Sequence, residues 1–293
     1  MSEEASRAYH EDPGRFRDAV LLTASETGFS ERLIEKDYYC SVLLNDLAAL
    51  YGRGLVFKGG TCLSKVHADF FRLSEDLDFA VSVKPDAARG VRRRLAEPFK
   101  AHLAGVAARL PIFSEVVALT GQNVNKQYNG QFAYRSAVTG DVESIKIEIS
   151  LREEFLLPCA ELPARTILID PLTRSSAVAP VAVRAISLLE AYAEKTRAAL
   201  TRRDPAIRDF FDLDNAIRKA LLQHGAPEFV GLVTQKLAVT DDHVDLSPTR
   251  LEALARQIET QLKPVLRNED YEEFVLDRMV ALLHEIASAC RSK

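Results

Sequence analysis

The stretch LVFKGGTCLSKVHADFFRLSEDLDF, residues 55–79, constrains the fold more than any other part of the chain. It opens with a short apolar run and then turns at two adjacent glycines, which permit backbone torsions that a side chain would resist. Thr61 is predicted to cap the helix that follows, so that its hydroxyl and the first free N–H groups face an anion. The pattern therefore predicts a strand, a tight turn and a helix start suited to a phosphate.

The end of this stretch carries two aspartates separated by one leucine. Side chains alternate along a strand, so Asp76 and Asp78 are expected on the same face. Two like charges side by side are costly unless a cation joins them, and carboxylate oxygens are ligands that Mg²⁺ prefers. We therefore predict that Asp76 and Asp78 bind metal. The alternative is an edge strand whose charges are solvated.

A third carboxylate is expected from the segment 143–151, which is predicted to be a strand. Isoleucines at every second position form its apolar face, and Glu148 therefore falls on the polar face, where it can join the aspartates. A surface glutamate is the alternative for this residue. Arg152 follows at the end of the strand, where it can face a phosphate or pair with an acid.

Other residues are expected to hold a nucleotide. Around the turn these are Lys58, Gly59, Gly60, Thr61 and Ser74, the last of which lies at the mouth of the site. Farther along the chain, Lys195 is a point charge suited to a triphosphate, and Asp209 is placed to orient it. A plain salt bridge between two helices is the alternative for this pair.

Taken together, these blocks resemble the AbiEii-type nucleotidyltransferase toxin family. The resemblance runs over about residues 31–213 and rests on IEKDYYC, KGGTCLSK, RLSEDLDF, an EIS strand and an EK…RDFFDL segment, in that order. It implies a nucleotidyltransferase-fold catalytic lobe, a largely helical C-terminal lobe and Mg²⁺-dependent transfer from an NTP. It also implies neutralisation by a separately encoded antitoxin. Acceptors in the family include the 3′ end of tRNA.

The predicted elements give an α+β fold, with a nucleotidyltransferase-fold mixed sheet flanked by helices and a mainly helical C-terminal lobe. Strands are expected at 55–57, 76–79, 115–121, 130–138, 143–151 and 166–169. Helices are expected at 16–27, 30–50, 85–110, 183–200, from 204 onward, 227–237, 247–262 and 271–291. We place the catalytic lobe at residues 1–172 and the helical lobe at residues 173–293.

Two charged runs allow more than one interpretation. The run Glu35-Lys36-Asp37 is typical of a helix face laced with ion pairs, and the resemblance adds a structural role beside the site. Arginines form the second group, which is a candidate basic rim for an RNA acceptor, with a solvated face as the alternative. Its members are Arg89, Arg92, Arg93, Arg94, Arg202 and Arg203.

Composition narrows the class of protein. A net charge of −4 argues against a general nucleic-acid coat, so any contact with RNA is expected to be local. The four cysteines show neither metal-site nor disulfide spacing, which favours a reducing cytoplasm. No apolar segment reaches the length of a membrane span. We expect a monomeric, cytoplasmic protein without a membrane partner.

The leading functional hypothesis is transfer of a nucleoside monophosphate from an NTP to an acceptor hydroxyl, the 3′ end of tRNA, which would block translation and growth. Asp76 and Asp78 would hold two Mg²⁺ ions, while Glu148 would complete the acceptor-side metal site and help to deprotonate the hydroxyl. Two alternatives stay open. One is nucleotide transfer to a small molecule such as an aminoglycoside, and the other is a catalytically silent protein that binds RNA or a partner.

Overall fold

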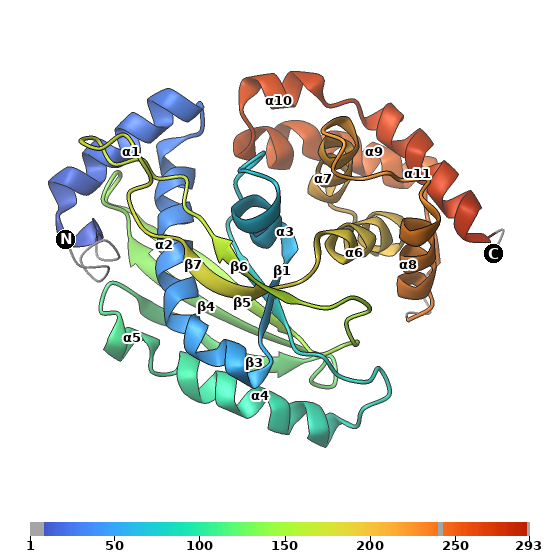
Figure 1. The fold of residues 1–293 in the computed structure, drawn as a ribbon, viewed down its shortest axis with the longest axis horizontal. Coiled ribbons are helices and arrows are strands. Elements are labelled where there is room, and N and C mark those ends of the chain that lie inside the picture. Colours follow the sequence, from blue (N-terminus) through green and yellow to red (C-terminus); the bar gives the residue numbers. More distant parts are fainter. Residues whose placement is uncertain (1–8, 240–242, 292–293) are drawn as a thin grey trace. The chain divides into compact units, whose positions relative to one another are not determined.

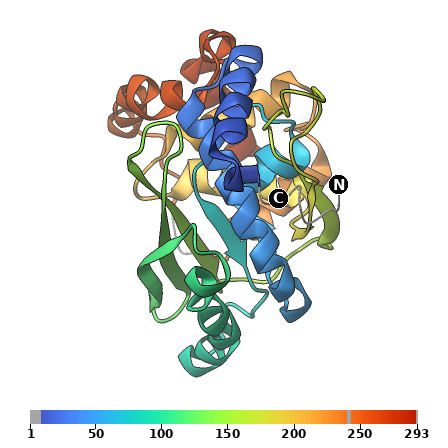
Figure 2. The same ribbon diagram turned by 90° about the vertical axis from the view of Figure 1, so that its left-hand side faces the viewer.

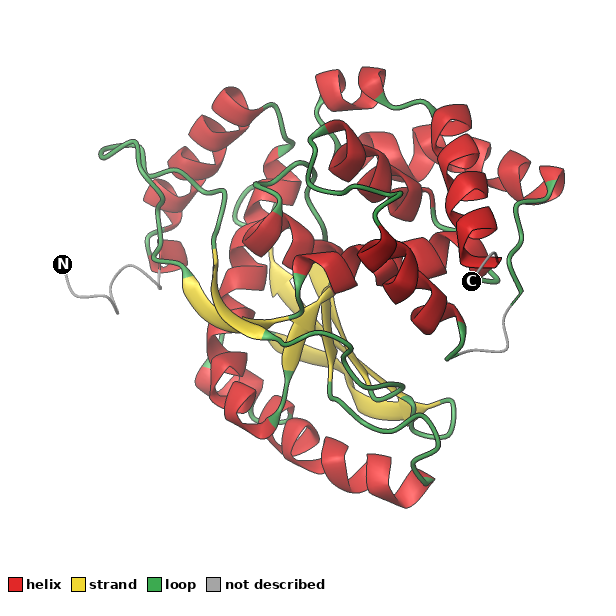
Figure 3. Cartoon of the chain, turned by 45° about the vertical axis from the view of Figure 1, so that its right-hand side comes forward, coloured by secondary structure: helices red, strands yellow, loops and turns green. Residues whose placement is uncertain are grey.

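The computed structural model describes residues 9–239 and 243–291. The chain divides into two compact units. One, here called the sheet unit, contains the described residues up to Phe155 together with Cys159–Ile186. The other, the helical unit, contains Leu156–Pro158 and the described residues from Ser187 onward. All seven strands belong to the sheet unit (Figure 3).

A mixed seven-stranded sheet forms the centre of the sheet unit, in the spatial order β3-β4-β5-β2-β1-β7-β6. The strands are β1 Val56–Lys58, β2 Leu77–Ala80, β3 Ser114–Gln122, β4 Gln127–Arg135, β5 Val142–Ser150, β6 Ala160–Ala164 and β7 Val181–Ala185. The central strand β2 pairs antiparallel with β1 and parallel with β5. Both strands of the glycine and aspartate stretch therefore lie at the centre of the sheet.

Helices surround this sheet and make up the helical unit, which confirms the predicted α+β class (Figure 1). Those of the sheet unit are η1 Tyr9–Glu11, α1 Pro13–Thr27, α2 Glu31–Leu47, η2 Ala48–Arg53, α3 Gly59–Cys62, η3 Leu63–His67, α4 Arg89–Leu103 and α5 Val106–Arg109. Those of the helical unit are α6 Leu188–Thr201, α7 Ile207–Arg218, α8 Pro227–Leu237, α9 Pro248–Gln257, η4 Ile258–Leu262, η5 Lys263–Val265, α10 Asn268–Glu273 and α11 Leu276–Arg291.

The two faces of the sheet differ in character. On β5 the isoleucines at every second position are buried, and they pair with the buried Leu77 and Phe79 of β2. Helix α2 covers this apolar face, because Tyr39 packs on Tyr134 of β4 with ring centroids 4.1 Å apart. Helix α4 lies on the same face, against the β3–β5 end of the sheet (Figure 2). The alternate residues of these strands form an opposite, polar face.

The charged run on α2 is a buried anchor. Asp37 Oδ1 lies 2.6 Å from Lys65 Nζ, and the side chain of Lys65 is fully buried. Asp37 Oδ2 also accepts hydrogen bonds from the Thr166 hydroxyl at 2.9 Å and the Ile167 N–H at 3.1 Å. One carboxylate on α2 therefore ties together the helix after the glycine turn and the loop that follows β6.

A second ion-pair group, also built on α2, reaches the residue just before Asp76. Arg32 and Lys36 both approach Glu75 Oε1, at 2.6 and 3.3 Å. The same two cations lie 3.2 and 3.6 Å from Glu143 Oε2. The prediction of an ion-paired helix face is confirmed, although Lys36 and its neighbours are buried rather than surface residues.

Several predicted element boundaries were wrong. Residues 166–169 form no strand beyond an isolated bridge from Ile169 to Ser176, and the missed strands are β6 and β7. The predicted helix from 183 begins only at Leu188, because the alternating sequence VAVRA pairs with β1 and β6 as β7. The predicted helix 85–110 is two helices, α4 and α5, and α7 begins at Ile207 rather than beside Asp204. Because β7 belongs to the sheet, the two units divide after Ile186 rather than at 172/173.

Candidate active site

The glycine turn lies directly against one of the predicted metal ligands. Gly59 starts α3 with φ 75°, a left-handed conformation that favours glycine. A Cβ at this position would lie 2.1 Å from Asp78 Oδ2, so the Asp78 carboxylate packs on the Gly59 backbone. The neighbouring Lys58 is the register partner of Asp78 across β1 and β2. Both the torsion and the contact therefore require glycine at position 59.

Thr61 does not cap the helix, contrary to the prediction. Helix α3 starts earlier, at Gly59, with Lys58 at the N-cap position. Thr61 is buried, and its hydroxyl donates to the backbone carbonyl of Asp76. The sequence motif placed the helix start two residues too late. The threonine instead holds the residue that precedes β2 against α3.

A buried arginine beside the turn was missed by the sequence analysis. A Cβ on Gly60 would lie 2.4 Å from Arg72 Nη2 and 3.1 Å from Ser74 Oγ, so both side chains border the turn. Arg72 is only 2% exposed, which brings a guanidinium close to the first residues of α3. The sequence offered one signal for this role, namely that an arginine stands two positions before Ser74. Its charge favours an anion at the turn.

The three predicted carboxylates lie together. Asp76, Asp78 and Glu148 line one pocket of about 410 Å³ on the polar face of the sheet. Asp78 and Glu148 are direct partners in the parallel pairing of β2 with β5, so their side chains project from adjacent strands to the same face. The rest of the lining comes from Val117, Asn129, Gly130, Gln131, Lys146 and Ile147.

Glu148 is positioned by a glutamine that the sequence analysis also missed. Gln127 Nε2 donates to Glu148 Oε2 at 2.7 Å. Gln127 Oε1 in turn accepts a hydrogen bond from Arg152, whose side chain is exposed. Gln127 opens β4, and no local pattern distinguishes it from other polar strand residues. Arg152 therefore acts on the carboxylate through Gln127.

The donors in this pocket suit Mg²⁺. They are carboxylate and amide oxygens, which are the hard ligands that this ion takes. No cluster of three or more Asp, Glu, His or Cys side chains able to enclose an ion occurs in residues 9–239 and 243–291. Since Mg²⁺ is usually held by one or two carboxylates together with substrate phosphates, the donor set fits an ion shared with a nucleotide.

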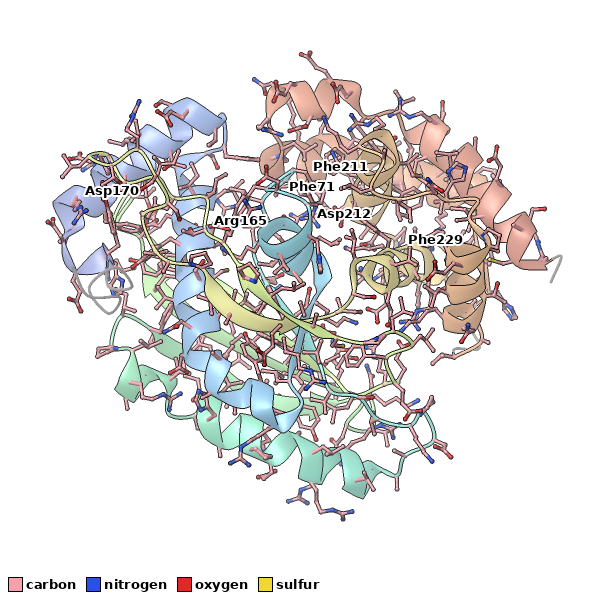
Figure 4. The ribbon with its side chains drawn as sticks, viewed as in Figure 1. Phe71, Arg165, Asp170, Phe211, Asp212 and Phe229 are labelled. Carbon is pink, nitrogen blue, oxygen red and sulfur yellow. The ribbon has the colours of Figure 1, made fainter. Side chains whose placement is uncertain are left out.

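Lys195 and Asp209 lie in the helical unit, on α6 and α7. Lys195 Nζ is 2.7 Å from Asp209 Oδ1 and 2.9 Å from Asp212 Oδ2. Asp212, labelled on α7 in Figure 4, is fully buried. The salt bridge between two helices is therefore present, and Asp212 makes it a three-residue cluster that fixes the ammonium group.

The arginines of α4 do not line the carboxylate pocket, because α4 covers the apolar face of the sheet. Arg92 is 3% exposed and donates to the backbone carbonyls of Leu151 at 2.9 Å, Pro85 at 2.7 Å and Ala87. The prediction that Arg92 contributes to a basic rim is wrong, since its guanidinium braces the loop before α4. A run of arginines on a helix did not reveal which one was buried.

With this geometry in place, comparison with known proteins assigns the chain to a family. The model of the nucleotidyl transferase AbiEii toxin family, type IV toxin–antitoxin system, matches residues 42–285. The chain belongs to this family. It is accordingly a nucleotidyltransferase of a toxin–antitoxin system, and membership implies an antitoxin as its partner. No curated protein matches the AbiEii chain.

One solved structure supports the fold of this AbiEii chain. The crystal structure of JHP933 from Helicobacter pylori has a TM-score of 0.51 at 15% identity, covering 90% of this chain and 94% of its own. A second H. pylori protein, whose assignment as a nucleotidyltransferase is provisional, has a TM-score of 0.47 at 15% identity, covering 89% and 91%. Among the described residues, no helix combines the length and the apolar character needed to cross a bilayer.

Proposed function

We propose that this AbiEii toxin transfers a nucleoside monophosphate from an NTP to the 3′ hydroxyl of tRNA and thereby blocks translation and growth. The observation that carries the proposal is the direct pairing of Asp78 with Glu148 next to the glycine turn. This arrangement puts carboxylates beside a backbone that can approach phosphate closely. The acceptor oxygen forms a bond to the α-phosphorus, and the bond from that phosphorus to pyrophosphate breaks.

The residues of the pocket divide this task between them. Asp76 and Asp78 would hold Mg²⁺, which neutralises phosphate charge and makes a bound hydroxyl more acidic. Glu148 takes the proton of the acceptor hydroxyl, and the hydrogen bond from Gln127 holds it in position. Pyrophosphate leaves with the electron pair of the broken bond.

On the other side of Asp78, the turn would hold the leaving phosphates. The backbone of Gly59 and Gly60 and the ammonium of Lys58 contribute here, and Ser74 borders the same turn. Thr61 supports the site indirectly, because its hydroxyl donates to the backbone carbonyl of Asp76. In the helical unit, Lys195 is proposed as a nucleotide ligand, with Asp209 as the acid that orients it.

The proposal is tested by incubating the purified protein with each α-labelled NTP, Mg²⁺ and deacylated bulk tRNA. We expect wild-type protein to label tRNA and Asp78→Asn to label it at least about 10³-fold more slowly, because the substitution removes an anionic ligand of the Mg²⁺ that would neutralise the phosphate charge. Asp86→Asn, at an exposed aspartate before α4, is the matched control and should retain wild-type activity. Labelling by Asp78→Asn at the wild-type rate would refute the assignment of the site.

A further inference from the structure

A row of polar side chains runs from Glu148 across the sheet, away from the glycine turn. Lys146 lies two residues before Glu148 on β5 and faces Gln131 on β4, while Asn129 faces Glu148. Gln131 is itself fixed, since its Nε2 donates to Ser144 Oγ at 2.6 Å. Lys146, Gln131 and Asn129 line the same pocket as the carboxylates. The pocket therefore extends at least one strand beyond the catalytic acids.

Lys146 differs from the other lysines that have been described. Lys36, Lys65 and Lys195 each approach a carboxylate within 4 Å, and they are largely buried. Lys146 is exposed, and no carboxylate among the described residues forms an ion pair with it. An unpaired ammonium in a pocket is a site for an anionic group of a ligand.

The strand order decides which substrate this anion belongs to. In a transfer with the attacking and leaving oxygens in line, the two oxygens lie on opposite sides of the α-phosphorus. The leaving pyrophosphate is assigned to the turn on β1, and the carboxylates stand on the next two strands, β2 and β5. The attacking hydroxyl must therefore come from the β5 and β4 side, where Lys146 and Gln131 lie.

We infer that this polar row is the acceptor subsite, and that Lys146 binds the phosphate next to the terminal nucleotide of a polynucleotide 3′ end. The amides of Gln131 and Asn129 are donors and acceptors for the ribose or base of that nucleotide. A polycationic acceptor such as an aminoglycoside would be repelled by Lys146. The inference rests on the proposed function, since it names the residues by which that site takes its acceptor.

Kinetics with Lys146→Met test this assignment. Lys146→Arg is the charge-preserving variant, and Lys100→Met makes the same change of charge on α4, which covers the opposite face of the sheet. The KM for deacylated bulk tRNA and the KM for NTP are measured over a series of salt concentrations. We expect Lys146→Met to raise the KM for tRNA about tenfold and to reduce the slope of log KM against log salt by about 0.7, the loss of one phosphate contact to a single strand.

The inference is supported if Lys146→Met raises the KM for tRNA and leaves the KM for NTP almost unchanged, while Lys146→Arg and Lys100→Met keep the wild-type KM for tRNA. It is overturned if Lys146→Met matches Lys100→Met, or if the change falls on the KM for NTP. If wild-type protein labels an aminoglycoside and not tRNA, the proposed acceptor and the inference both fail. If wild-type protein labels tRNA and Lys146→Met does so with the same kinetics, only the inference fails.

Discussion

Glu75 and Asp76 are adjacent in the chain, yet they belong to two charged regions that are organised in opposite ways. Glu75 joins the α2 region, where Arg32 and Lys36 neutralise it at 2.6 and 3.3 Å. Asp76 joins the carboxylate pocket, and no cation among the described residues forms an ion pair with it. In the first region Asp37, Glu75 and Glu143 each meet a base of the chain. In the second, Asp76 shares a pocket with Asp78 and Glu148.

This difference separates a region that stabilises the fold from a region that is proposed to carry out the reaction. When one partner of a buried ion pair is removed, the other charge is left buried and unpaired, which strongly destabilises the fold. Carboxylates gathered in one pocket disfavour each other's charged form, which a bound cation would relieve. The α2 region is therefore expected to show its importance in stability, and the pocket in turnover.

The largest expected effect is a loss of nucleotide transfer when the glycine turn is altered. In Gly59→Ala the new Cβ collides with the Asp78 carboxylate, and we expect at least about a 10²-fold loss of nucleotide transfer because the acid is displaced. Gly140→Ala is the matched control, since Gly140 also has a left-handed φ, 79°, with nothing within 4 Å of a Cβ. Gly140→Ala should lose about 1 kcal/mol of stability through its torsion alone, and Gly59→Ala should lose more because its Cβ also collides. Equal activity in the two variants would show that nucleotide transfer does not depend on the packing of Asp78 against the turn.

The next effect concerns stability in the α2 region. Asp37→Ala leaves the fully buried Lys65 without its carboxylate, and we expect the free energy of unfolding to fall by about 3–5 kcal/mol in denaturant titrations. Asp76→Ala removes an acid of the pocket and should leave that free energy unchanged or raise it in the absence of Mg²⁺. If the two substitutions cost the same, the division between scaffold and pocket does not hold.

A smaller effect is expected where a neutral residue supports the pocket. Gln127→Ala removes the hydrogen bond to Glu148, and we predict about a tenfold decrease in kcat, in line with a net hydrogen bond of about 1.5 kcal/mol to a charged group. If Gln127 only positions the base, the KM for NTP and the KM for tRNA should stay at their wild-type values. A rise in either KM would assign Gln127 to substrate contact instead.

The smallest expected effect is a pH dependence of stability that arises from His10, which contacts α2. Burial lowers the pKa of His10 from its usual 6.5, against a smaller opposing effect of Glu11, and His10 Nδ1 lies 2.7 Å from the Tyr38 hydroxyl on α2. The unfolded chain therefore binds this proton more readily, so stability is complete above 6.5 and is lost as the pH falls below it. We expect Tm to drop by roughly 1–3 °C between about pH 7.5 and about pH 5.5 for this group.

His10→Gln should remove that part of the drop, and the exposed His284→Gln should not. Thermal scans at both pH values make the comparison. An identical drop in all three proteins would mean that His10 takes no part in the pH dependence.

The sequence was informative wherever the structure follows from local alternation. The spacing of Asp76 and Asp78, and of Glu148 among isoleucines, correctly predicted that all three share one face of the sheet. The hairpin at residues 139–141 was likewise predicted, and it joins β4 to β5 around Gly140, whose φ is positive. Period-two patterns and glycine turns are short-range signals, so a single sequence carries them.

The sequence was uninformative where a role depends on distant partners. Arg72 and Gln127 support the site through contacts that only the folded chain brings about. The strands β6 and β7 are short, and a Pro at position 163 disguised the first of them, although proline is tolerated on an edge strand. Arg92 looked identical to the exposed arginines beside it. The role of each was settled by tertiary contacts.

The anchoring of α2 also bears on the order in which the protein can be made. Asp37 finds Lys65 28 residues later in the chain and Thr166 129 residues later. During translation the N-terminal helices emerge first, so this acid leaves the ribosome long before its last partner exists. We expect the nascent toxin to stay without an anchored site until nearly all of its sheet unit has been synthesised. A cell making the toxin therefore has an interval in which the unfinished chain is present but not yet able to act.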